Sequence, residues 1–237
     1  LSEVAVATEI SPAVARRCLN TLVDLGYVGK KGKLFLLTPE VMGFASAFIE
    51  SMNLEEIVRP YLQRVRDKTG DSTSLAVLSE FDILYLVHIS TARMIRLAAG
   101  VGTRFPAYPT SLGRVLLAHQ EPARVDEYFA EVELRKLTTK TITSKSELRK
   151  ILLQVRKVGY AALQDELDYG IVSVAVPVFG PDGEILAAIN CSTATTRVTK
   201  DTMVKTRLPE LKQAAKKIEV ELRRYPILVH SIRSAAS

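Results

Sequence analysis

Residues 11–38 read SPAVARRCLNTLVDLGYVGKKGKLFLLT, and this stretch decides how the first part of the chain folds. Serine followed by proline is typical of a helix start, because serine caps the first N–H groups and proline fits the first helical position. We expect the helix to run from Pro12 to about Leu25 and to end at Gly26. The elements expected next are the two strands and the turn of a hairpin, at residues 27–28, 34–37 and 29–32.

The apolar residues of this helix recur at helical spacing and divide it into two faces. The face expected to pack inward holds Val14, Ala15, Cys18, Leu19, Leu22 and Leu25. The face expected to point outward holds Ala13, Arg16, Arg17, Asn20 and Asp24. Such an outward face suits the major groove of DNA, because alanine allows close approach, arginine reaches guanine or phosphate, and asparagine pairs with adenine.

The lysine-rich hairpin turn adds a second basic element, for which contact with phosphate is the natural use. The residues predicted to contact DNA are Ser11, Ala13, Arg16, Arg17, Asn20, Lys30, Lys31 and Lys33. The alternative is a solvated helix face beside a lysine-rich surface turn, which would be the better interpretation of either element alone. The order and lengths of helix, turn, capped helix and basic hairpin favour a winged helix-turn-helix.

A shorter helix, capped by Ser2, is expected before this one. The sequence begins at Leu1, without methionine and already inside a patterned segment. A winged domain needs a further helix to close its core. Val4, Leu19 and Leu22 are therefore expected to lack a partner unless sequence before Leu1 supplies one.

Composition is that of an ordinary globular protein with a small and a medium domain: 237 residues, 47% hydrophobic and 24% charged. The net charge of +6 is compatible with an anionic partner but does not require one. Cys18 and Cys191 each lie within an apolar pattern, which predicts reduced, buried thiols and a cytoplasmic location. No apolar run approaches the length that spans a membrane, and we expect neither a membrane span nor a leader.

After residue 39 the pattern changes. Two helices are expected, an apolar one at 40–51 that packs on a partner such as a second subunit, and one at 54–68 capped by Asn53. Strands and helices then alternate, with strands expected at 74–79, 83–89, 93–98, 172–179 and 184–192 and helices after Ser111, from Ala123, at 144–158 and at 200–224. The turn at 180–183, which contains Asp-Gly, predicts a hairpin. The expected fold is α+β on an antiparallel sheet, with domains at 1–39, 40–70 (connecting helices) and 71–237.

Several stretches in register resemble the IclR family of bacterial regulators. In the winged-helix part they are LSEVA at 1–5, SPAVARRCLNTLVDLGYV at 11–28 and FLLTPEVMGFA at 35–45. Beyond it they are GTRFPAYPTSLGRVLLAH at 102–119, the run from VRKVGYAALQDELDYG to TRVT at 155–199, and LPELKQAAKKIEVEL at 208–222. Within the family, PAYPTSLGRVLLA and DELDYG are most similar to regulators of protocatechuate, 4-hydroxybenzoate and β-ketoadipate catabolism. The resemblance implies a GAF-like effector domain, a homodimer or homotetramer, a palindromic operator, and control by a small aromatic or dicarboxylic acid.

The resemblance also implies a ligand pocket lined by Ala98, Ser111, Gly113, Arg114, Leu163, Asp165, Ser173, Asn190 and Ser192. The chemistry of these positions is consistent with such a pocket. Asn190 and Ser192 share one strand face and need partners if that face is buried. These partners are either a polar ligand or neighbouring backbone groups or water. Ser111 is expected to cap a helix whose N-terminus attracts a carboxylate, and Arg114 to clamp that anion or to lie at the surface.

Catalysis and metal binding have little support in the sequence. His88, His119 and His230 have no metal-ligand spacing, and His88 is expected to be a satisfied core residue. The acidic residues Asp165, Glu166 and Asp168 are expected to be solvated. We therefore predict no cofactor, no metal and no enzyme activity. The alternative from another class is a metabolite-binding or catalytic α+β domain with an N-terminal protein-association segment.

Overall fold

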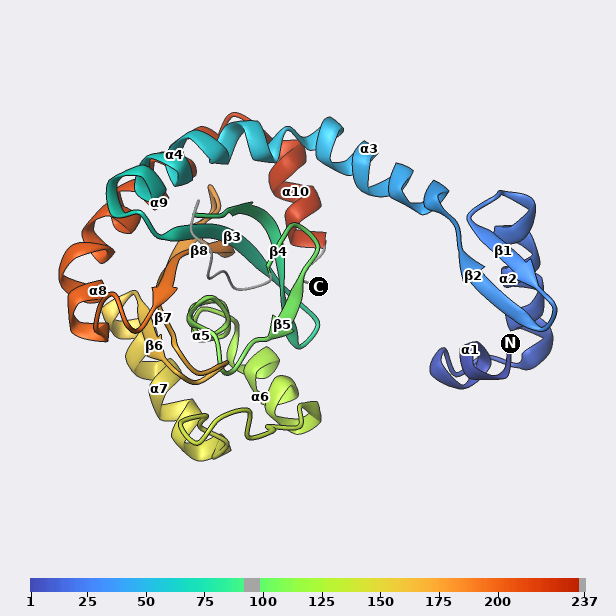
Figure 1. Ribbon diagram of the computed structural model, residues 1–237, viewed down its shortest axis with the longest axis horizontal. Coiled ribbons are helices and arrows are strands. Elements are labelled where there is room, and N and C mark those ends of the chain that lie inside the picture. The colour runs from blue at the N-terminus through green and yellow to red at the C-terminus, as the bar shows by residue number, and fades with distance from the viewer. Residues whose placement is uncertain (92–98, 235–237) are drawn as a thin grey trace. The chain divides into compact units, whose positions relative to one another are not determined.

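The structure is a computed structural model that describes residues 1–91 and 99–234. It divides into two compact units, Leu1–Asn53 and Leu54–Ser237 (Figure 1). The strand expected at 93–98, and with it the pocket residue Ala98, lies outside the described residues.

The first unit is a helix pair followed by a two-stranded hairpin and a further helix (Figure 1). Its elements are α1 (Ser2–Ala7), α2 (Pro12–Asp24), β1 (Val28–Lys31), β2 (Leu34–Leu37), the 3₁₀ turn η1 (Pro39–Val41) and α3 (Met42–Met52). The Ser-Pro start and the glycine end of α2 are confirmed, since Ser11 accepts from the N–H of Val14 at 3.4 Å and Gly26 has φ of +83°. Ser2 lies inside α1 rather than at its cap, which is Leu1.

Thr38 ties the hairpin to the end of α2. Its N–H donates to the carbonyl oxygen of Tyr27 at 3.0 Å, and its hydroxyl donates to that of Gly26 at 2.5 Å. The Tyr27 ring in turn stacks on Phe44 of α3 with 4.6 Å between ring centroids. The hairpin, the end of α2 and α3 are therefore held to one another within this unit.

The second unit is a six-stranded sheet with helices on both faces. Its strands are β3 (Ser72–Ser79), β4 (Asp82–Ile89), β5 (Arg104–Pro106), β6 (Ala161–Gln164), β7 (Ile171–Phe179) and β8 (Ile185–Ala194), in the order β5-β4-β3-β8-β7-β6. Every neighbouring pair is antiparallel, which confirms the α+β class. The helices are α4 (Leu54–Thr69), α5 (Ser111–Ala118), α6 (Pro122–Glu131), α7 (Lys145–Val158), α8 (Lys200–Thr206), α9 (Leu208–Leu222) and α10 (Pro226–Ser234).

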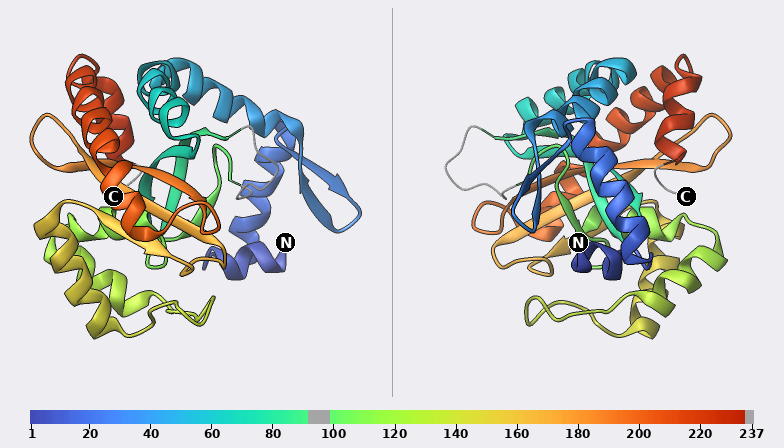
Figure 2. Two further views of the ribbon diagram at one scale, coloured as in Figure 1. Left: turned by 60° about the vertical axis from the view of Figure 1, so that its left-hand side comes forward. Right: turned by 90° about the vertical axis from the view of Figure 1, so that its right-hand side faces the viewer.

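The two faces of the sheet carry different helices. On one face α5 packs against β7 and β8, with α7 packed behind α5, and on the other α4 and α9 pack against β3, β4 and β7 (Figure 2). Because side chains alternate along β8, Asn190 faces α5 while Cys191 faces α4, where its sulfur lies 3.7 Å from the hydroxyl of Thr69. Neighbouring residues of β8 therefore face the helices on opposite sides of the sheet.

One expectation about this unit was wrong, and three of its elements were not predicted. The helix expected at 200–224 is two helices, because Pro209 lacks the N–H that a continuous helix requires and instead starts α9. The strands β5 and β6, with three and four residues, are too short to show a period in the sequence. The helix α10 also went unpredicted.

Candidate nucleic-acid interface and ligand cavity

The outward face predicted for α2 is exposed. The residues Ser11, Ala13, Arg16, Arg17 and Asn20 are all exposed, while Ala15 and Leu19 on the opposite side are buried. Neither the two arginines nor Asn20 makes an ion pair or a side-chain hydrogen bond among the described residues. The helix therefore presents arginine and asparagine donors, with a small residue at its start, to solvent.

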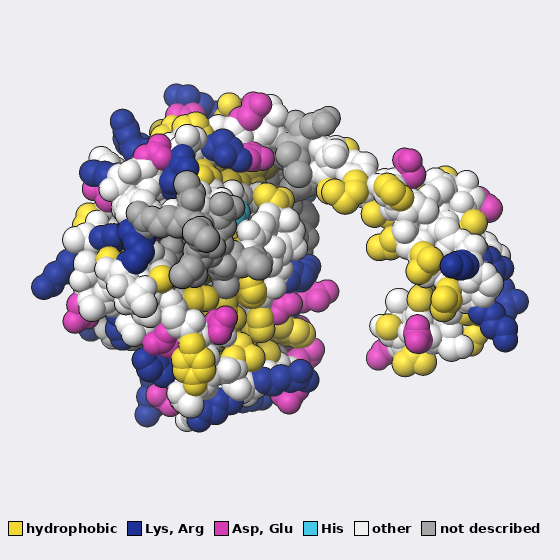
Figure 3. Space-filling view, viewed as in Figure 1, with side chains coloured by type: hydrophobic (Ala, Val, Ile, Leu, Met, Phe, Trp, Pro, Cys, Tyr) yellow, Lys and Arg dark blue, Asp and Glu magenta, His cyan; other side chains and the backbone are white. Residues whose placement is uncertain are grey.

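The hairpin differs in detail from the prediction. Its first strand is β1, Val28–Lys31, so Lys30 and Lys31 lie on the strand and only Lys33 lies in the two-residue turn with Gly32. Lys30 lies over the ring of its cross-strand partner Phe35, with 5.8 Å from Nζ to the centroid. All three lysines remain exposed. Figure 3 shows the basic side chains of this unit gathered along one edge.

The inward face of α2 is only partly covered. Cys18 is exposed, Leu22 is 38% exposed and Leu25 is 61% exposed, so the expectation that Cys18 is a buried thiol was wrong. The hydrophobic spacing identified the apolar side of the helix correctly. It carried no information on which elements cover that side, and α1 covers only part of it among the described residues.

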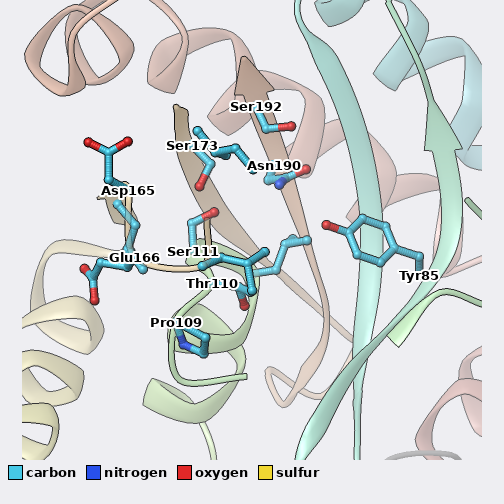
Figure 4. A pocket seen from close by; sticks show the side chains of 13 residues that line it. Tyr85, Pro109, Thr110, Ser111, Asp165, Glu166, Ser173, Asn190 and Ser192 are labelled. Carbon is cyan, nitrogen blue, oxygen red and sulfur yellow. The ribbon is translucent and has the colours of Figure 1, made fainter. Parts of the chain in front are cut away.

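A cavity of about 30 Å³ lies between the start of α5 and the sheet (Figure 4). Six of the predicted pocket residues line it: Ser111, Leu163, Asp165, Ser173, Asn190 and Ser192. Gly113 and Arg114 do not line it. The sequence reasoning missed Tyr85, Pro109, Thr110, Leu112, Glu166, Leu167 and Ile171, which also line it.

Two polar atoms in this cavity are unpartnered in the part of the chain that the structure describes. The hydroxyl of Ser111 and the amide oxygen of Asn190 are buried and make no hydrogen bond among the described residues. Leaving such groups unpaired costs about 1–3 kcal/mol each. Both line the same small cavity, one from α5 and one from β8 (Figure 4). The site therefore carries polar groups that a ligand could satisfy.

Tyr85 contributes a third polar group from β4. Its side chain is buried, and burial raises the pKa of its hydroxyl to about 12, with a smaller opposing effect from the Ser74 hydroxyl. The phenol therefore stays protonated near neutral pH and has an O–H that can donate a hydrogen bond. The strand DILYLVHI alternates in burial, and a polar aromatic residue at an inward position was the signal that could have identified it.

The start of α5 is built differently from the prediction. Thr110, not Ser111, is the cap, and its hydroxyl accepts from the N–H of Gly113 at 3.0 Å. Gly113 lies so close to Ala107 that an added Cβ would stand 2.1 Å from the Ala107 carbonyl oxygen. The glycine is therefore required by close packing, and the cap leaves the Ser111 hydroxyl available to the cavity.

Arg114 is buried and forms an ion pair rather than facing the cavity. Its Nη1 donates to Glu166 Oε1 at 3.0 Å, its Nη2 bonds the other carboxylate oxygen, and its Nε donates to the carbonyl of Tyr108 at 2.9 Å. The structure thus brings Arg114 to Glu166, 52 residues later in the chain, and Glu166 to the cavity wall.

Asp165 is also held in place, so the expectation that the acidic cluster is solvated was wrong for two of its three members. Its carboxylate accepts from Lys140 Nζ at 2.8 Å and from the N–H of Gly170 at 2.7 Å. The hydrogen bond from Lys140 lowers the pKa of Asp165. The carbonyl of Asp165 accepts from the hydroxyl of Thr138 at 2.5 Å, so the loop before α7 is hydrogen-bonded to this wall of the cavity.

The imidazoles of His88 and His119 each lie within hydrogen-bond distance of a protein group. His88 Nδ1 lies 2.9 Å from the Ser74 hydroxyl, and His119 Nδ1 lies 2.8 Å from the Val115 carbonyl oxygen. Burial lowers the pKa of both imidazoles. Within residues 1–91 and 99–234 no group of three or more metal-ligating side chains comes together, and no helix there has the length and apolar character to cross a membrane.

Comparisons with known proteins identify the family to which both units are similar. The profile described as IclR helix-turn-helix domain matches residues 1–32, and that described as Bacterial transcriptional regulator IclR C-terminal matches residues 46–220. The chain is 36% identical to the Pca regulon regulatory protein of Pseudomonas putida, over 91% of this chain and 75% of that protein. It is 31% identical to the p-hydroxybenzoate hydroxylase transcriptional activator of Acinetobacter baylyi, over 92% of this chain and 82% of that protein.

One solved structure to which this chain is similar is that of a single domain. It is the inducer binding domain of a double mutant of the PobR transcription factor from Acinetobacter, in complex with 3-hydroxybenzoic acid. The similarity has a TM-score of 0.66 and 27% sequence identity and covers 69% of this chain and 96% of that one.

Proposed function

The chain belongs to the IclR family of bacterial DNA-binding transcriptional regulators, and from that premise we propose that a small aromatic acid, bound in the cavity beside α5, controls its DNA binding. The family consists of regulators, not enzymes, so the alternative of a catalytic domain with an association segment was wrong. The proposal depends on one observation above all: the unpartnered Ser111 and Asn190 atoms line one cavity.

For the DNA we propose that α2 enters the major groove and the β1–β2 hairpin contacts phosphates. Exposed Arg16, Arg17 and Asn20 provide base and phosphate donors, and the exposed lysines of the hairpin add charge. Bidentate arginine contacts with guanine discriminate by about 1–3 kcal/mol. The proposed location is the cytoplasm, and the proposed assembly is a homodimer or homotetramer. The operator is palindromic, because a two-fold protein places two such helices in successive major grooves.

For the ligand we propose a carboxylate near the start of α5 and an aromatic ring between this helix and the sheet. The first N–H groups of a helix have no intrahelical acceptor and favour an anion. The Ser111 hydroxyl and the Asn190 amide lie at the same place, and the neutral Tyr85 phenol offers a further partner. Leu112, Leu163 and Leu167 provide the apolar surface. Relatives named for the pca regulon and for p-hydroxybenzoate hydroxylase support an aromatic acid and a role in aromatic catabolism.

The size of the cavity supports a mechanism by population shift. A volume of about 30 Å³ holds about two water molecules, too little for a benzoate ring. The acid therefore binds a more open arrangement and shifts the protein toward it. Asn190 touches the cavity while the next residue, Cys191, touches Thr69 of α4, so a movement of β8 reaches the helix that follows α3. Repression and activation are both compatible with this coupling.

A thermal-shift panel tests the ligand. We expect 4-hydroxybenzoate or protocatechuate, at about 100 times its Kd, to stabilise the protein by about 2.7 kcal/mol. That corresponds to a rise in Tm of roughly 5–10 °C for a domain of this size. Adipate serves as the dicarboxylic member of the panel. A Tm that no acid in the panel changes at millimolar concentration would refute the aromatic-acid proposal.

Two asparagine variants act as controls for each other. Asn190→Ala should abolish the thermal shift and leave DNA affinity without ligand unchanged. Asn20→Ala should lower sequence preference on DNA and leave the thermal shift unchanged. Loss of both properties in both variants would show misfolding instead of two separate sites, and the melting curves without ligand reveal that case directly.

A further inference from the structure

A second and larger cavity lies on the other side of the wall formed by β6. It is a groove between α7, β6 and α8 with a volume of about 460 Å³, within the range of roughly 300–1,000 Å³ typical of small-molecule sites. We propose that this groove, the α7–α8 groove, binds a small amphipathic acid. The proposal goes beyond the function proposed above, which concerns only the cavity beside α5.

The floor of the groove is apolar. Val155 of α7 and Ala161 and Leu163 of β6 are buried there, and Val158 and Val204 line it half-buried. Apolar surface that remains open to solvent in a concave site gains about 25 cal/mol for each Å² that a ligand covers. This floor is suited to the hydrocarbon or aromatic body of a ligand.

The mouth of the groove is cationic. Lys200 and Lys205 of α8 are exposed and make no hydrogen bond or ion pair among the described residues. Lys212 of α9 lies over the ring of Tyr160, which lines the groove, with 5.9 Å from Nζ to the centroid. Asp201 is the one acidic side chain among the lining residues, so the mouth carries excess positive charge. An apolar floor below a cationic mouth selects a ligand with one apolar and one anionic end.

The groove and the cavity beside α5 share a wall. Leu163 lines both, Arg114 lines the groove, and its partner Glu166 lines the cavity. A ligand in the groove and an acid in the cavity therefore contact opposite ends of one buried ion pair. Movement of this wall on one side changes the shape of the other site, which gives the second ligand a physical route to alter binding of the first.

The absence of tryptophan from the chain allows a direct test. Tyr160→Trp places a single tryptophan in the groove and keeps an aromatic ring under Lys212. The probe is 8-anilinonaphthalene-1-sulfonate, an aromatic sulfonate that accepts excitation energy from tryptophan. We expect the emission of the introduced tryptophan to fall on titration with the probe in a saturable manner with one site per chain. Val204→Trp, on the opposite wall, is a second reporter if the first variant folds poorly.

Charge-reversal variants test whether the lysines at the mouth of the groove contribute to probe binding. In the reporter background, Lys205→Glu should weaken probe binding roughly fivefold to tenfold, since two units of charge change near the sulfonate in a partly solvated setting. Lys136→Glu, an exposed lysine in the loop before α7, is the matched control and should change binding less than twofold. Equal effects of the two variants, or reporter emission that does not respond to the probe, would overturn the proposal.

The same titration separates this site from the cavity beside α5. Asn190→Ala should leave probe binding in the groove unchanged, and Lys205→Glu should leave the thermal shift by 4-hydroxybenzoate intact. If Asn190→Ala abolishes the reporter response, the probe occupies the cavity and the groove proposal is wrong. A reporter emission that changes with protein concentration in the absence of probe would assign the groove to a second copy of the chain, which also contradicts it.

Discussion

The guanidinium of Arg114 meets the carboxylate of Glu166 at two points, with Nη1 3.0 Å from Oε1, and both side chains are almost inaccessible to solvent. Arg114 belongs to α5 and Glu166 to the loop after β6. The pair therefore ties the loop that lines the cavity beside α5 to α5 itself. In this protein the expected anion clamp is an internal ion pair.

Breaking that pair on one side should destabilise the protein. Glu166→Gln leaves the Arg114 charge buried beside a neutral partner, and we expect a loss of about 3 kcal/mol in the free energy of unfolding. The double variant Arg114→Met with Glu166→Leu should lose less than the single variant, because it leaves no uncompensated charge. Urea denaturation measures both, and a cost below about 1 kcal/mol for Glu166→Gln would contradict the buried pair.

Gly113 provides a sharp test of packing at the start of α5. A methyl group there would stand 2.1 Å from the Ala107 carbonyl oxygen, so Gly113→Ala requires the backbone to move. Overpacking of this kind costs about 1–3 kcal/mol. Gly43 of α3, where an added Cβ meets nothing within 4 Å, is the control. We expect Gly43→Ala to be neutral or stabilising by up to about 1 kcal/mol. The same sign of effect at both positions would argue against the close contact.

Ser111→Ala should separate stability from ligand binding. The Ser111 hydroxyl is buried without a partner among the described residues, so its removal eliminates an unsatisfied group and is expected to stabilise the protein without ligand by about 1 kcal/mol. The same change should weaken binding of 4-hydroxybenzoate at least about fivefold, because the hydroxyl is proposed to bond the acid. Calorimetric titration and thermal melting give the two values. Lower stability without ligand would indicate that the hydroxyl already has a partner.

Stability should fall when the pH drops from about 7.5 to about 5.5. The pKa values of His88 and His119 are lowered in the folded protein by burial, and for His119 the nearby Arg156 adds to that effect against the Val115 hydrogen bond. Below about pH 6.5 the unfolded chain binds protons that the folded chain does not, so acid favours unfolding. The double variant His88→Gln with His119→Gln should show a flatter dependence of Tm on pH. An unchanged slope would remove the histidines as the cause.

The sequence predicted best where a local rule determines the structure. Ser11 with Pro12 and the glycine at 26 set the bounds of α2, and Asp-Gly set the β7–β8 hairpin, because caps and tight turns depend on a few adjacent residues. The alternation along the strand likewise put Asn190 and Ser192 on one face, and both line the cavity. These inferences needed no knowledge of the rest of the chain.

Other features depend on residues far apart in sequence, and there the prediction was wrong or silent. The partner of Arg114 lies 52 residues away, and Lys140 reaches Asp165 across 25 residues. The choice between Thr110 and Ser111 as helix cap depends on backbone geometry, since either hydroxyl could serve. The exposure of Cys18 depends on which elements cover α2, and the spacing of apolar residues within α2 does not reveal them.

DNA binding with and without the acid tests the central claim most directly. A duplex selected from a random pool by the full chain would be labelled, and its affinity measured by fluorescence anisotropy against a scrambled duplex over a range of salt concentrations. We predict a preference of at least about 10³-fold, a steep loss of affinity with salt, and a cost of roughly 1–3 kcal/mol for Arg16→Ala on the selected duplex alone. We also predict that 4-hydroxybenzoate or protocatechuate changes affinity for the selected duplex by at least about fivefold. Equal affinity for selected and scrambled duplexes, unaffected by either acid, would contradict the account.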